Sequence, residues 1–137
     1  ATSLCIVAMG AVMPEAIEAA AYLGQERSGI GVLSITSADR LSAGWHGAQR
    51  AREQGLSEAT SHVEALLGAL PRDAAIVTIC DAHPETLSWI GAVKGHRVRA
   101  LGPEHFGQSG SIPELYAHYG LNVDAIVRAG RALRRET

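Results

Sequence analysis

Asp81 and His83 are residue types that could do acid-base chemistry, and they directly follow Ala75–Cys80, an apolar run typical of a buried strand. A carboxylate two residues from an imidazole can orient that imidazole as a general base. The same Asp-x-His-Pro pattern is also typical of a turn that begins the next helix. We prefer the turn interpretation, and a small hydrolase that uses His83 with Asp81 is the alternative.

A second polar stretch, Gly107-Gln108-Ser109-Gly110-Ser111, precedes a capping box formed by Ser111 and Glu114. Free amides at a helix start favour negative charge, so Ser109 to Ser111 could bind an anion or a nucleotide. The stretch has neither the Gly-Lys-Ser/Thr of a P-loop nor a Gly-x-Gly-x-x-Gly fingerprint, and it lacks the spacing of a Gly-x-Ser-x-Gly nucleophile elbow. A structural capped turn is the preferred interpretation.

Metal and redox chemistry receive little support. The histidines, at positions 46, 62, 83, 96, 105 and 118, show no ligand spacing with one another. Cys5 and Cys80 each lie in a strand-like apolar run, which predicts two buried free thiols.

Trp89, Phe106 and Tyr116 lie near glycines, and buried aromatic residues often contribute most to the energy of a protein interface. We therefore favour an interface as the functional use of this region.

Four apolar, β-rich runs predict strands. The predicted strands are Leu4–Met9, Gly29–Thr36, Ala75–Cys80 and His96–Leu101, the last nearer a sheet edge because polar and apolar residues alternate in it.

Between and after the strands, apolar residues recur at helical spacing. The predicted helices are Pro14–Gly24, an irregular one over residues 40–54, Ser57–Leu70, Glu85–Val93, and a last helix capped by Asn122. Alternation of strands and helices predicts a three-layer α/β/α sandwich with a mainly parallel (mixed) sheet of four to five strands. Gly10, Ser37, Asp81 and Gly102 should then lie near strand ends, where ligands and partners meet such sheets.

Composition limits the classes of partner. The 137 residues fit one domain, and the net charge of -2 provides no basic field for nucleic acid or an anionic membrane. No apolar run approaches the ~20 residues of a membrane span, and the N-terminus shows no leader, so we expect a cytoplasmic protein. The start at Ala1, without an initiator Met, predicts a trimmed chain or a single domain excised from a longer one.

The order of these motifs resembles the C-terminal domain of transketolase-type thiamine diphosphate enzymes. The resemblance covers nearly the whole chain, and its specific part is the loop from Leu101 to Gly110 with the Pro113–Tyr116, Tyr119–Leu121 and Asp124–Val127 segments behind it. Asp-x-His-Pro-x-Thr-Leu from Asp81 and the Phe-Gly-Gln-Ser-Gly loop look closest to the homodimeric pyruvate dehydrogenase first component. Transketolase proper is the near alternative.

The resemblance implies a structural and dimerisation domain whose parent enzyme decarboxylates a 2-oxo acid and passes the acyl group to lipoamide. It also implies partners, namely the other domains of the parent and a second copy in a homodimer. Thiamine diphosphate and Mg belong to those other domains, because the Gly-Asp-Gly motif that holds them does not occur in these 137 residues. We therefore expect no cofactor, no metal and no catalytic residue in this domain.

What the resemblance does carry over is a location, the rim where subunits and domains of the family meet. Its candidate residues are Asp81, His83, His105, Phe106, Gly107, Gln108, Ser109 and Gly110. The resemblance further implies a five-stranded mixed sheet with one antiparallel strand, of which four strands are evident in the sequence.

Overall fold

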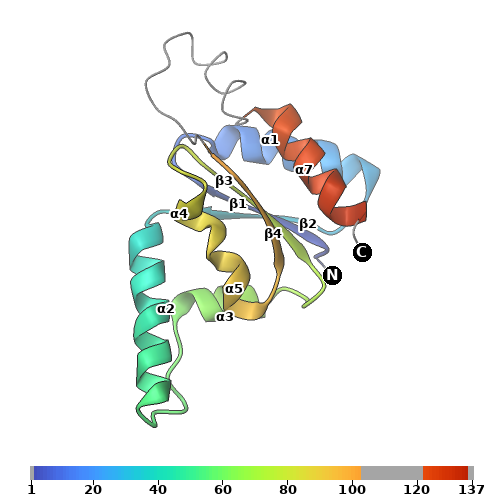
Figure 1. Ribbon diagram of the computed structural model, residues 1–137. Helices are drawn as coiled ribbons and strands as arrows, with labels where there is room; N and C mark the ends of the chain where they lie inside the picture. Colours follow the sequence, from blue (N-terminus) through green and yellow to red (C-terminus); the bar gives the residue numbers. More distant parts are fainter. Residues whose placement is uncertain (1, 103–121, 136–137) are drawn as a thin grey trace.

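A computed structural model describes residues 2–102 and 122–135 of the chain. Figure 1 shows a twisted sheet with helices on both of its faces. The strands are β1 (Leu4–Met9), β2 (Ile30–Ile35), β3 (Ala75–Cys80) and β4 (Arg97–Leu101). The helices are α1 (Met13–Glu26), α2 (Ala38–Glu53), α3 (His62–Gly68), α4 (Glu85–Ser88), α5 (Ile90–Lys94) and α7 (Val123–Arg135).

The four strands of the described residues are all parallel and lie in the order β2-β1-β3-β4. The chain runs outward from β1 to β2, then returns to the other side of β1 for β3 and β4, so the strand order reverses between β1 and β3. This reversal places helices on both faces, and it confirms the predicted three-layer α/β architecture. The antiparallel fifth strand implied by the family is not among the described residues.

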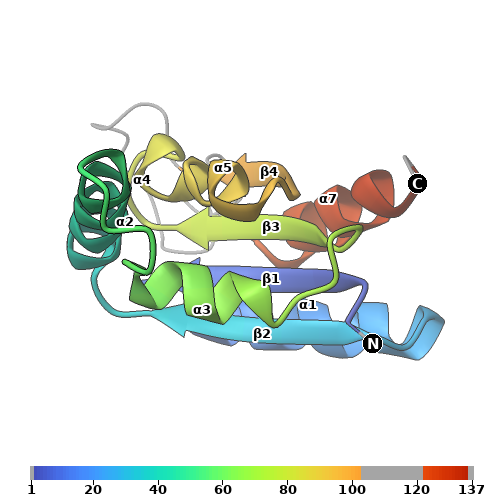
Figure 2. The ribbon, with the colours of Figure 1, turned by 90° about the horizontal axis from the view of Figure 1, so that it is seen from below.

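The core is divided by the sheet because successive side chains of a strand point to opposite faces. On one face Leu4, Ile6 and Ala8 of β1 pack with α1 and α7. On the other face Cys5 and Val7 pack with α3, α4, α5 and the first turns of α2. Figure 2 shows the two helix layers from below the view of Figure 1. The two central strands are therefore covered on both sides, which explains their continuous apolar sequences.

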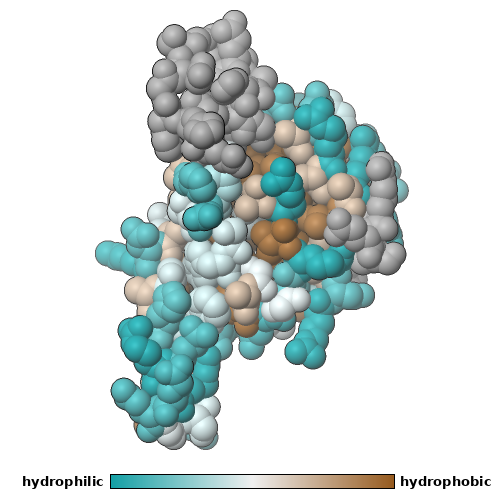
Figure 3. Space-filling view, in the orientation of Figure 1, coloured by the Kyte–Doolittle hydropathy of each residue, from teal (hydrophilic) through white to brown (hydrophobic). Residues whose placement is uncertain are grey.

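Helix α2 differs from its prediction. It is continuous over Ala38–Glu53 despite Gly44 and Gly47, which had predicted an irregular helix. The Ser37 hydroxyl accepts a hydrogen bond from the Arg40 amide (3.4 Å) and caps the first turn. Only the beginning of α2 lies over the sheet, while its far end projects from the body and is covered by hydrophilic residues (Figures 1 and 3).

Helix α3 begins at His62, five residues after the predicted start at Ser57. Arg52 explains the difference, because its Nη1 donates to the Ala59 carbonyl (2.8 Å) and to Oε1 of Glu64 (3.2 Å). The Ser61 hydroxyl also donates to Glu64 (2.8 Å). These contacts hold the connection between α2 and α3 in a non-helical path. The predicted helix Glu85–Val93 is likewise two short helices, α4 and α5.

The predicted strands agree with the structure to within a residue at either end. The Asn122 cap is also confirmed, since its Oδ1 accepts a hydrogen bond from the Ala125 amide (3.0 Å) at the start of α7. Both cysteines are buried free thiols, as predicted.

Candidate functional site

The carboxyl ends of the strands form one rim of the sheet, and the reversal of strand order places its centre between β1 and β3. Gly10 follows β1 and Asp81 follows β3. Oδ2 of Asp81 accepts a hydrogen bond from the Ala11 amide (3.3 Å), 70 residues away in the sequence. The Asp81 side chain therefore bridges the point at which doubly wound sheets generally bind their ligands.

Gly10 makes this bridge possible. A Cβ built on Gly10 would lie 2.4 Å from Oδ1 of Asp81, and the φ angle of +88° is one that residues with side chains rarely adopt. Gly102, which follows β4, is similarly close to the neighbouring turn, because a Cβ there would lie 2.5 Å from the Ala82 carbonyl oxygen. At this rim, the Asp81 carboxylate packs closely against the backbone of Gly10, and the Ala82 carbonyl packs closely against Gly102.

His83 belongs to the turn that starts α4. Its Nδ1 accepts a hydrogen bond from the Glu85 amide (3.2 Å), and its carbonyl accepts one from the Thr86 amide (2.9 Å). No hydrogen bond joins Asp81 to His83, both of which lie in the described part of the chain. The two side chains therefore have separate structural partners, which supports the turn interpretation.

The Trp89 side chain packs and forms a hydrogen bond within the domain. Its ring stacks on Trp45 with centroids 5.6 Å apart, and its Nε1 donates to the Thr86 carbonyl (2.9 Å). The remaining candidates, His105, Phe106, Gly107, Gln108, Ser109 and Gly110, lie outside the described residues, as does the predicted capping box of Ser111 and Glu114.

The described residues offer little to a metal ion at this rim. Within residues 2–102 and 122–135, no three His, Cys, Asp or Glu side chains are grouped so that they could hold a metal ion. The Asp81 carboxylate, the acid nearest the centre of the rim, already accepts a backbone amide. Within the described residues, the rim therefore has no group of three acidic side chains for a magnesium ion. No helix of the described residues is long and apolar enough to cross a membrane.

The opposite rim, at the amino ends of the strands, holds a feature that sequence reasoning missed. Arg27, Arg97 and Arg134 line one pocket there, although they come from three different elements. Their positions in the sequence gave no signal, because the residues are brought together only by the fold.

Comparison with models of protein families identifies the family of this chain. The family model of the transketolase-like TK C-terminal domain matches residues 1–122. This chain belongs to that family. No curated protein sequence matches the chain.

Solved structures agree on the fold. A split-gene transketolase, solved as an inactive β4 tetramer, matches 96% of this chain and 39% of its own, with a TM-score of 0.69 and 19% identity. The transketolase of Leishmania mexicana matches with a TM-score of 0.65 and 24% identity, over 98% of this chain and 17% of its own. That of Pichia stipitis gives a TM-score of 0.61, 21% identity, and the same two coverages. The chain thus spans well under half the length of these solved chains.

Proposed function

We propose that this chain is the C-terminal domain of a thiamine diphosphate-dependent enzyme of the transketolase type, and that it acts as a scaffold for companion parts. The observation that carries the proposal is the family match over residues 1–122. The solved transketolases that share the fold are longer chains, of which this domain corresponds to a part. On this proposal the chain is one domain of a larger cytoplasmic enzyme.

The cofactor would lie in the companion domains. The sequence has no Gly-Asp-Gly motif, and the described rim offers no cluster of acids for a magnesium ion. The part of this chain would be to position those domains and a second copy of the enzyme. We therefore assign no catalytic step to Asp81 or His83.

Transketolase proper is the better candidate for the parent enzyme. The solved structures described above, which share the fold, are transketolases. One of them, from Pichia stipitis, is in complex with xylulose 5-phosphate. A pyruvate dehydrogenase first component is the second candidate, supported by Asp-x-His-Pro from Asp81 and the Phe106–Gly110 loop. The structural uses of Asp81 and His83 weaken the first of these two supports.

Reconstitution tests the proposal. The companion domains of the parent enzyme would be produced with and without this domain, and two reactions would be measured: ketol transfer from xylulose 5-phosphate and decarboxylation of pyruvate. We expect thiamine diphosphate-dependent ketol transfer that requires this chain. Pyruvate decarboxylation in its place would favour the second candidate, and activity unaffected by the chain would contradict the scaffold role.

The rim contact needs a separate test. We propose that the rim candidates, from Asp81 and His83 to the His105–Gly110 loop, face the companion parts. Phe106→Ala should then weaken co-purification of the chain with its companion domains, since aromatic residues often anchor interfaces. Tyr22→Ala is the matched control, because Tyr22 is an exposed aromatic residue on α1. Equal effects of the two variants would contradict the assignment of the rim.

A further inference from the structure

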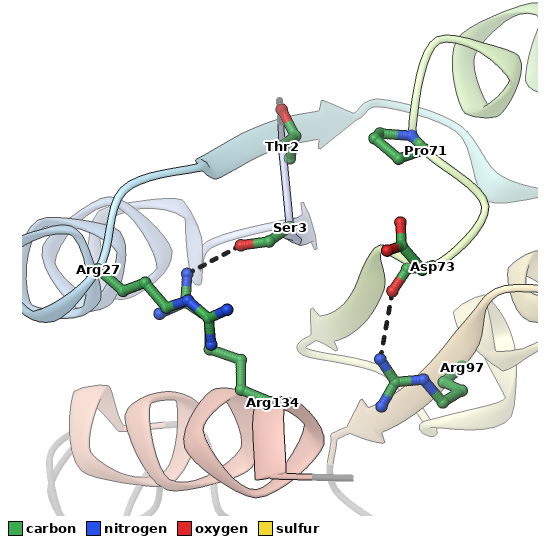
Figure 4. A pocket seen from close by; sticks show the side chains of 7 residues that line it. All are labelled: Thr2, Ser3, Arg27, Pro71, Asp73, Arg97 and Arg134. Carbon is green, nitrogen blue, oxygen red and sulfur yellow. Dashed lines mark hydrogen bonds between the residues drawn. The ribbon is translucent and has the colours of Figure 1, made fainter. Parts of the chain in front are cut away.

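We draw no further inference here: the strongest candidate, the pocket of about 220 Å³ at the amino ends of the strands (Figure 4), gives no sign of a ligand, because Arg97 and Arg134, two of the three arginines that line it, are both held by other groups of the chain and neither is an uncompensated charge.

Discussion

Gly10 and Asp81 pack against each other across the point where the strand order reverses, and the carboxylate fills the space that a side chain at position 10 would need. Oδ1 of Asp81 lies against Gly10, while Oδ2 accepts the amide of Ala11. The two residues therefore join the carboxyl ends of β1 and β3. In many doubly wound sheets this crevice holds a ligand, whereas here a side chain of the chain itself bridges it.

Gly10→Ala should destabilise the protein by about 2 to 5 kcal/mol, through the strain of a positive φ and the overlap with Asp81. The free energy of unfolding in urea would measure the effect. Gly95→Ala isolates the first cause, because Gly95 also has a positive φ (+78°) and nothing lies near its Cβ position.

The overlap between a side chain at position 10 and the Asp81 carboxylate is isolated by adding Asp81→Ala. In that background Gly10→Ala should cost no more than Gly95→Ala, which is about 1 to 2 kcal/mol. An unchanged cost of Gly10→Ala after removal of the carboxylate would show that Asp81 does not constrain position 10.

The central strands β1 and β3 were predictable from the sequence because each is a continuous apolar run that is buried on both faces of the sheet. β4, with its alternating pattern, was correctly placed at an edge. Helix α2 was predicted less well. Intrinsic propensity penalises Gly44 and Gly47, but packing of Leu41 and Trp45 against the core outweighs that penalty. The Ser61-x-x-Glu64 pattern is a helix-start signal that would have placed the beginning of α3 correctly.

The sites were less predictable than the fold. Position at a strand end is local information, so the sequence could place Asp81 and His83 on the rim. The partner of Asp81 is 70 residues away, and no local pattern specifies it. The three arginines of the opposite pocket are set together by packing of α1, β4 and α7, which sequence periodicity does not resolve.

Helix α2 should gain stability from Gly44→Ala, because Gly44 is an exposed interior position of the helix with open space at its Cβ. We expect about 0.5 to 1 kcal/mol from the lower conformational freedom of the unfolded chain. Thermal and urea unfolding would measure the gain. A loss of stability would indicate that α2 is not helical around position 44.

Gly130→Ala should behave differently although Gly130 also lies within a helix, α7. A Cβ there would lie 2.9 Å from Leu4 Cδ2 and 3.0 Å from Leu23 Cδ1, and both leucines are fully buried. We expect this variant to be less stable than Gly44→Ala by about 1 to 3 kcal/mol, since a packed core resists added volume. Equal stability of the two variants would mean that α7 packs less closely on β1 and α1.

Glu64 should make stability depend on pH. Burial raises its pKa, but hydrogen bonds from Ser61 and Arg52 lower it more, so the pKa falls below the ordinary value of 4.5. A lowered pKa in the folded state stabilises the protein above the unfolded pKa, and this contribution disappears as the pH falls through the folded value.

Glu64→Gln should therefore cost about 1 kcal/mol at neutral pH, where the ion pair with Arg52 is intact, and progressively less as the pH falls below the unfolded pKa and through the lowered folded one. Urea unfolding at neutral pH and at a pH below the unfolded pKa would measure the difference. Glu53→Gln, at an exposed position of α2, is the control. A constant cost of Glu64→Gln at both pH values would contradict the ion-pair account.

Cys5 and Cys80 should be unreactive in the folded protein. Burial raises the pKa of the Cys5 thiol to about 11, and burial also raises the pKa of Cys80, whose Sγ donates to the Ala82 carbonyl (3.3 Å). The reactive species is the thiolate, so both thiols should react with an aromatic disulfide reagent at least about 100-fold more slowly in the native protein than in urea. Cys80→Ala and Cys5→Ala would assign the signal to one residue. Rapid native reaction of either single-cysteine variant would place its thiol at the surface and contradict the packing of β1 or β3.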